Sequence, residues 1–274
     1  MFHEDMKRTM YFFWHEDMEK APIIVQKCLE SWKYYNPTWN IVVMDMTNYS
    51  NYLDDVEDFS VAISDKNLLT SEQACLRRSF IHIENAEITK FTDVLRLFLL
   101  ERNGGLWVDA TCFCNCPLDD WLPNHISQGF FVFDNLTRLG KKSSNWFMYS
   151  EPNNYMIRMW KNAMMRTYKE NQVQFRETYF IMHDLFDELC ETNRIFAEIF
   201  ENIPKTGQND HNMYFDLQQK GNLFIKNNGF LEPLTSNIRD MIVNKEKYLF
   251  KLSHKCDYVL QPQSILAFLF STIG

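Results

Sequence analysis

Three segments near the start of the chain follow the order strand, helix, strand, and this order restricts the fold more than any other sequence feature. Residues 11–14 form an aromatic run typical of a short buried strand, and residues 21–35 are typical of a helix with Pro22 near its first turn. Residues 40–45 are rich in apolar and β-branched side chains, as expected of a parallel strand covered on both faces. These segments form a βαβ unit, so the sequence predicts an α/β fold.

A second helix and strand follow in the middle of the chain. Thr92 is suited to cap a helix whose apolar body extends to residue 100, and the Asn-Gly-Gly sequence at residues 103–105 allows the left-handed turn that ends it. Residues 106–108 then predict a strand with Asp109 at its carboxyl end. Ligands of open α/β sheets bind outside the carboxyl ends of the strands, so Asp109 is the first candidate for a functional residue.

The whole chain, residues 1–274, is predicted to form one domain. With 274 residues, 46% of them hydrophobic, it can bury a core without disulfides or metal ions. Residues 47–88 are polar and mixed. Later elements are predicted as strands at 129–133 and 146–149 and as helices at 153–169 and 178–191. We therefore expect an α/β core over about residues 1–150 and a helical subregion over about residues 151–274.

Charge and apolar runs exclude two classes of protein. The 28 Lys and Arg residues against 36 Asp and Glu residues give a net charge of −8, so the chain lacks the basic stripe that duplex nucleic acid requires. The acidic start is unlike a targeting segment, and the late apolar run at residues 265–270 is far shorter than the roughly 18 residues of a membrane span. We expect a cytoplasmic protein, with peripheral membrane attachment through exposed aromatic residues as an option.

Three of the seven cysteines are clustered. Cys112, Cys114 and Cys116 are spaced by two, which would place them on one face of a strand, where thiolates can bind a metal ion. Zinc sites usually use Cys-x-x-Cys with a distant second pair, which this chain lacks. The alternative is that the three side chains are small packed residues of a strand.

Asp93 and Arg96 are three residues apart in the predicted middle helix. This spacing places both side chains on one face of the helix, where they can form a charged edge directed to the same cavity as Asp109. The alternative is an intrahelical salt bridge on a solvated face.

Residues 91–96 (Phe-Thr-Asp-Val-Leu-Arg) and 103–111 (Asn-Gly-Gly-Leu-Trp-Val-Asp-Ala-Thr) closely resemble the signature of one enzyme group. The group is the sugar-nucleotide-dependent glycosyltransferases of capsular polysaccharide synthesis, related to glycosyltransferase family 32 and the large clostridial glucosylating toxins. Its pattern is a Ser/Thr-Asp-x-x-Arg helix, a Gly-Gly turn, and a strand that ends in Asp-x-Asp or Asp-Ala-Thr. Residues 11–37 look like the opening of the same proteins, and residues 251–255 look like their closing motif.

The resemblance implies a GT-A type fold with a Rossmann-like nucleotide-sugar-binding core. It implies a nucleoside diphosphate sugar as donor, with a UDP-sugar favoured, and a glycan or a lipid-linked oligosaccharide as acceptor. The enzyme would transfer a hexose or an N-acetylhexosamine with retained anomeric configuration, in bacterial surface polysaccharide synthesis.

The resemblance also assigns roles to single residues. Asp93 and Arg96 match the positions that hold the hydroxyls of the donor sugar, which suits a carboxylate and a guanidinium. Asp109 matches the first Asp of Asp-x-Asp, which approaches the ribose and the metal-bound diphosphate. Trp14, or less directly Phe12 and Phe13, matches the first-strand region against which the base stacks; the alternative for Trp14 is a core aromatic.

The chain departs from the toxins at one metal ligand. Thr111 stands where they have a second Asp, and a neutral hydroxyl is a weaker ligand. Two arrangements remain open. In one, Mn²⁺ or Mg²⁺ is held by Asp109, the donor phosphates, water and His254. In the other, Lys251 and Lys255, which flank His254, neutralise the diphosphate themselves.

On the acceptor side, Asn145 follows a glycosyltransferase-like position, and His183 and Asp184 lie on a predicted helix where they could face the cleft. The alternative for these residues is the surface or core of a helix. Two other functions remain open for the whole chain. One is a nucleotide-sugar-binding protein without turnover, and the other is a metal-dependent phosphohydrolase that uses Asp109 with Asp93.

Overall fold

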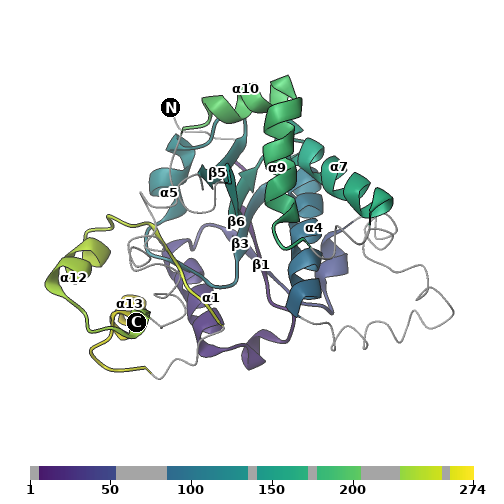
Figure 1. Ribbon diagram of the computed structural model, residues 1–274. Coiled ribbons are helices and arrows are strands. Elements are labelled where there is room, and N and C mark those ends of the chain that lie inside the picture. Colours follow the sequence, from purple (N-terminus) through teal and green to yellow (C-terminus); the bar gives the residue numbers. More distant parts are fainter. Residues whose placement is uncertain (1–5, 54–84, 135–140, 172–177, 205–228, 255–259) are drawn as a thin grey trace.

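A five-stranded sheet forms the centre of the computed structural model, which describes residues 6–53, 85–134, 141–171, 178–204, 229–254 and 260–274 (Figure 1). The strand order is β2-β1-β3-β6-β5. The bounds are β1 Thr9–Phe13, β2 Asn40–Met44, β3 Gly105–Asp109, β5 Phe130–Asp134 and β6 Ser143–Ser150.

The predicted βαβ unit is confirmed. β1 pairs in parallel with both β2 and β3, and helix α1 (Ile23–Tyr35) connects β1 to β2. β6 runs antiparallel to β3 and to β5, so the described sheet is mixed. One expectation was wrong for the described part of the chain: residues 41–43 of β2 are only half-buried, because β2 lies at the edge of the sheet.

Helices cover the sheet, and the described elements after residue 150 are mostly helical. α4, α7 and α9 stand together on one side of the sheet, with α1 across from them (Figure 1). α4 packs on β3 and β6, and α9 packs on β6 and α7. Short α5 (Leu118–Trp121) and strands β5 and β6 are among the elements between β3 and the later helices. The remaining bounds are α4 Asn85–Asn103, α7 Tyr155–Glu170, α9 Ile181–Thr192, α10 Arg194–Asn202, α12 Ser236–Val243 and α13 Ile265–Ser271.

Helix α4 begins well before the predicted cap. Thr92 lies inside the helix, where its hydroxyl donates a hydrogen bond to the carbonyl of Thr89 at 2.9 Å. Threonine can therefore satisfy its hydroxyl within a helix as well as at its start, which is why the cap prediction was wrong. The predicted glycine turn at the other end is confirmed. Gly105 has φ 103°, and a Cβ there would lie 2.4 Å from the carbonyl oxygen of Thr9.

A second, two-stranded sheet returns the late part of the chain to the core. β4 (Cys112–Cys114) pairs antiparallel with β7 (Leu249–Lys251), and the register places Cys112 opposite Lys251. Because β4 follows β3 directly, this pairing holds Lys251 close to the carboxyl end of β3.

The clustered cysteines are packed residues. Cys112 and Cys114 lie in β4, whereas Cys116 lies beyond its end, and all three are buried and free. Burial raises the pKa of Cys114 to about 12 and that of Cys116 to about 11, so both are protonated thiols at neutral pH. Metal binding needs thiolates, so this environment favours the packing alternative. Within the described ranges, no helix is both long enough and apolar enough to cross a membrane.

Candidate active site

An open cavity of about 330 Å³ lies at the carboxyl ends of β1 and β3. The last residues of these strands, Phe13 and Asp109, are register partners, and both line it. This is the place where open α/β sheets bind ligands, as predicted for Asp109. Other predicted site residues that line the cavity are Trp14, Arg96, Thr111, Lys251 and His254.

Arg96 is the centre of the polar network in this region. The residue is 3% exposed, and its guanidinium lies 3.2 Å from Asp93 Oδ1 and 3.4 Å from Asp109 Oδ1. It also donates from Nε to the carbonyl of Thr92 and lies over the ring of Trp107, 4.9 Å from its centroid. A buried guanidinium is tolerated only with such partners, so the solvated salt-bridge alternative is wrong.

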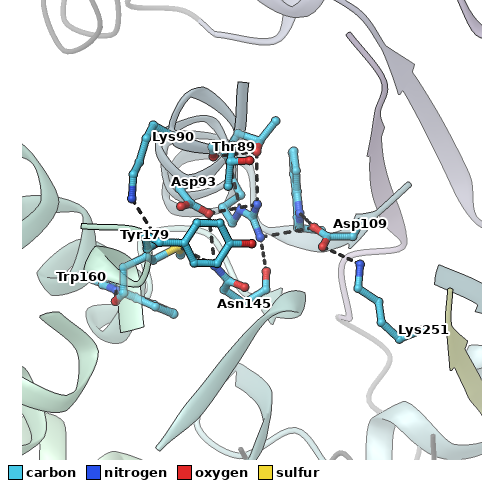
Figure 2. A network of polar contacts seen from close by, with 12 residues as sticks. Thr89, Lys90, Asp93, Asp109, Asn145, Trp160, Tyr179 and Lys251 are labelled. Atoms are coloured by element: carbon cyan, nitrogen blue, oxygen red, sulfur yellow. Dashed lines mark hydrogen bonds and ion pairs between the residues drawn. The ribbon is translucent and has the colours of Figure 1, made fainter. Parts of the chain in front are cut away.

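Asp93 is 2% exposed and points into this network (Figure 2). Its Oδ1 accepts a hydrogen bond from Asn145 Nδ2 at 3.2 Å, besides the contact with Arg96. Burial raises the pKa of Asp93 to about 6, although the charges of Arg96 and Lys90 act in the opposite direction. The carboxyl is thus ionised at neutral pH but titrates close to it.

Asp109 has a different environment, at the edge of the cavity with 29% of its side chain exposed. Oδ1 accepts from Trp107 Nε1 at 3.3 Å and faces Arg96, while Oδ2 lies 2.8 Å from Lys251 Nζ. Partial burial alone would raise the pKa of Asp109, but the ammonium of Lys251 and the guanidinium of Arg96 outweigh it and lower the pKa. Asp109 therefore carries a full negative charge at neutral pH.

Lys251 comes from the other end of the chain and closes this network (Figure 2). Besides Asp109, its Nζ donates to Thr111 Oγ1 at 2.9 Å. The structure thus brings Lys251 beside Asp109 and Thr111, whereas its role at a diphosphate stays a prediction. Lys255, the other lysine of the predicted pair, lies outside the described residues.

Aromatic side chains form a second wall of the cavity. Trp14 follows β1 directly, is 8% exposed, and meets the ring of His254 edge-on at 5.2 Å between centroids. Its indole Nε1 is buried and has no hydrogen-bond partner among the described residues. Trp14 is therefore both packed and part of the cavity wall.

The oxygen atoms in the cavity do not fit Mn²⁺ or Mg²⁺. Such ions prefer carboxylates, phosphates and water, and the one carboxylate that lines the cavity, Asp109, already faces two side-chain cations. Thr111 is neutral and already accepts from Lys251. No group of three or more His, Cys, Asp or Glu side chains in the described part of the chain could hold a metal ion. Metal binding by Asp109 and His254 stays a prediction that this geometry does not support.

Sequence reasoning missed two residues that shape the site. Lys90 donates from Nζ to the carbonyls of Thr178 and Tyr179, the latter at 3.1 Å, and so ties the segment before α9 to α4. Tyr179 is 62% exposed and lines the cavity. Lys90 lies three residues before Asp93, which is a helical spacing, but the misplaced helix start hid this signal.

The structure brings one predicted acceptor-side residue, Asn145, to the polar network and places His183 and Asp184 elsewhere. Asn145 contacts Asp93, but His183 and Asp184 do not line the cavity. Asp184 pairs with Lys141. His183 Nδ1 is buried without a hydrogen-bond partner among the described residues, and burial lowers the pKa of this imidazole to about 4, so it is neutral.

Known proteins resemble this chain in sequence and in fold. The family model described as "Capsular polysaccharide synthesis protein" matches residues 2–267. A search of curated protein sequences finds no match.

Among solved structures, the glycosyltransferase GlyE of Streptococcus pneumoniae TIGR4 superposes with a TM-score of 0.50 at 9% identity, over 98% of this chain and 62% of that chain. This chain therefore spans about 62% of the length of GlyE. The PaToxG glycosyltransferase gives a TM-score of 0.43 at 14% identity, over 89% of this chain and 85% of that chain. The glycosyltransferase domain of the YGT toxin gives 0.36 at 8% identity, over 72% of each chain. The likeness to GlyE confirms the predicted α/β fold.

Proposed function

The chain belongs to the capsular polysaccharide synthesis protein family of glycosyltransferases, and on this premise we propose its reaction. The enzyme transfers a hexose or an N-acetylhexosamine from a UDP-sugar to a hydroxyl of a glycan or lipid-linked oligosaccharide, with retained anomeric configuration. One observation carries the proposal. Asp93, Arg96 and Asp109 form one buried network at the carboxyl end of β3, beside a cavity with an aromatic wall.

The donor sugar binds at Asp93 and Arg96. Ionised groups make shorter and stronger hydrogen bonds than neutral ones, and a carboxylate with a guanidinium can hold two adjacent hydroxyls. The contacts of Arg96 with Asp109 and with the ring of Trp107 fix its position before the sugar arrives. Binding then costs little side-chain entropy.

The nucleotide and its diphosphate bind along the other side of the cavity. The base stacks on the aromatic wall at Phe13 and Trp14. Lys251 supplies positive charge beside Asp109, which offsets the repulsion between this carboxylate and the phosphates.

In the reaction, the bond between the anomeric carbon and the β-phosphate oxygen breaks, and its electron pair stays with the departing diphosphate. The acceptor hydroxyl oxygen forms the new bond to the anomeric carbon on the same face of the sugar, and its proton passes to the departing phosphate oxygen. The needs of such an oxocarbenium-like transition state are positioning, neutralisation of the leaving group and exclusion of water. No dedicated general base is required.

The acceptor reaches the open side of the cavity near Tyr179. An exposed aromatic ring at a cavity edge is suited to stack on a sugar ring, so Tyr179 is the acceptor-side residue that we favour. With a lipid-linked acceptor, the enzyme works at the cytoplasmic surface of the membrane.

The proposal is tested with the purified chain and a panel of UDP-, GDP- and CMP-sugars, each with Mn²⁺ and with EDTA. We expect a thermal shift with UDP-sugars and the release of UDP when an oligosaccharide acceptor is added. NMR of the product then reports the anomeric configuration. Binding of the sugar nucleotide without release of UDP would identify a binding protein, and hydrolysis to UMP and a sugar 1-phosphate would identify a phosphohydrolase.

A further inference from the structure

The side chain of Lys251 bridges the two ends of the Asp-Ala-Thr segment. Its Nζ lies 2.8 Å from Asp109 Oδ2 (Figure 2). The same Nζ lies 2.9 Å from Thr111 Oγ1. In the toxins that the sequence resembles, these two positions both carry carboxylates. Here one position carries a hydroxyl, and an ammonium lies between the pair.

The backbone fixes this placement. β7 pairs with β4 in a register that sets Lys251 opposite Cys112, and the next amide, of Leu252, donates to the carbonyl of Thr111 at 2.8 Å. The side chain of Lys251 is 15% exposed, so it is held inside the site and does not reach in from solvent. The ammonium is therefore a built part of the site.

The cations of the network exceed its carboxylates without a divalent ion. Asp93 and Asp109 contribute two negative charges, whereas Arg96 and Lys251 in contact with them and Lys90 near Asp93 contribute three positive charges, which leaves positive charge for the donor diphosphate. A divalent cation bound to Asp109 would have to displace Lys251 and would still lie near Arg96. Repulsion between like charges is strong where solvent screens them little.

We propose that Lys251 takes the place of a divalent metal ion, so that the enzyme binds its donor and releases the diphosphate without one. The inference rests on the proposed function, because it names the group that balances the charge of the donor diphosphate. When the bond to the anomeric carbon breaks, the electron pair stays on the diphosphate oxygen, and the ammonium of Lys251 stabilises that charge by a charge-assisted hydrogen bond.

The first test uses the unmodified chain. The dissociation constant of UDP is measured by calorimetry in EDTA and again in millimolar Mn²⁺, together with UDP release from a UDP-sugar. We expect the two constants to agree within about twofold and turnover to continue in EDTA. Binding that is lost in EDTA would overturn the inference and leave the proposed function intact, whereas no binding under either condition would overturn both.

The second test uses variants of Lys251. Lys251→Met is expected to weaken UDP binding about 10- to 100-fold in EDTA, the range for loss of a hydrogen bond to a charged group. Lys251→Arg, which keeps a cation, should recover part of the affinity. Lys142→Met is the matched control, because it removes an ammonium from an ion pair with Glu191 at the surface, and it should leave the affinity unchanged. Equal affinity in Lys251→Met and the unmodified chain would overturn the inference.

The double variant Thr111→Asp, Lys251→Ala is designed to restore a metal site. It supplies a second carboxylate and removes the competing ammonium, so UDP binding should become dependent on Mn²⁺. Melting temperatures of all variants report whether each one is folded. The inference would be overturned if the folded double variant bound UDP equally well with and without Mn²⁺ while Lys251→Met regained its affinity for UDP on addition of Mn²⁺.

Discussion

Helices α4 and α10 differ in the charged side chains that they bury. α10 places Phe196 and Phe200 in the core and leaves Arg194, Glu198 and Glu201 exposed. α4 also buries apolar residues, but with them it buries three charged ones, Lys90, Asp93 and Arg96, each at most 7% exposed.

The two patterns have different energetic consequences. Burial of the aromatic rings of α10 against α9 stabilises the fold directly. The buried ion cluster of α4 loses hydration energy that its internal contacts repay only in part, so it adds little stability. α10 therefore serves the fold, whereas the proposed function assigns the charges of α4 to ligand binding.

The largest expected effect comes from the aromatic cluster in which α10 packs against α9. Phe186 of α9 lies 5.0 Å from both Phe196 and Phe200 and 4.7 Å from Trp160, as distances between ring centroids. Phe186→Ala should lower the free energy of unfolding by about 3–5 kcal/mol, because it leaves a cavity in the core. Urea unfolding measures this loss. The folded fraction should bind UDP with unchanged affinity, and a large loss of affinity would show that this cluster supports the site as well.

The second prediction concerns the charged residues beside the cavity. Asp109→Asn keeps the shape of the side chain but removes the charge that holds Arg96 and Lys251 in position, so we expect kcat to fall about 10²–10³-fold, as for loss of one preorganised contact to a transition state. The melting temperature should stay close to that of the unmodified chain. A strongly lowered melting temperature would instead mark Asp109 as a structural residue.

The third prediction separates the two carboxylates of the network by pH. The pKa of Asp93 is raised to about 6 and that of Asp109 is lowered. Of these two carboxylates, therefore, Asp93 alone takes up a proton between pH 7.5 and pH 5. The affinity for a UDP-sugar should fall about tenfold over this interval if the ionised carboxylate holds the sugar. The methyl ester of UDP, which has the same charge and no sugar, should bind equally at both pH values.

Asp93→Asn is the control, since it should bind the UDP-sugar with the same affinity at both pH values. The raised pKa also affects stability, with a defined sign. The folded state binds the proton of Asp93 more tightly than the unfolded state, so stability from this group is full below pH 3.8 and is lost as the pH rises through about 6. A UDP-sugar affinity that does not change between pH 7.5 and pH 5 would remove Asp93 from the sugar site.

The smallest effect belongs to the exposed charges of α10. Arg194 and Glu198 form an i,i+4 pair at 2.7 Å, with 90% and 54% of their side chains exposed. Arg194→Ala should change the free energy of unfolding by no more than about 0.5 kcal/mol, because solvent screens the pair. Thermal unfolding measures this change, and a shift as large as that of Phe186→Ala would contradict the division between the two helices.

The fold and the local part of the site were predictable from the sequence. The βαβ order and the glycine turn follow from short-range rules, and Asp93, Arg96 and Asp109 lie on one helix and the next strand. The contact of Lys251 with Asp109 and Thr111 was not predictable from spacing, because it depends on the pairing of β4 with β7.

The start of α4 was also beyond local rules. Thr92 has the side chain of a good N-cap, yet the helix continues through it from Asn85. Tertiary packing on β3 and β6 extends the helix beyond what its capping residues indicate. The same extension places Lys90 on the helix beside the site, which is why the helix start and Lys90 were missed together.

The pairing of β4 with β7 also sets an order of events during biosynthesis. A chain leaves the ribosome from its N-terminus, so α4 and β3 emerge long before β7. Until Lys251 emerges, Asp109 and Thr111 lack the ammonium that contacts both of them in the folded chain. A nascent chain can therefore pair the strands of the main sheet before the proposed donor site is complete.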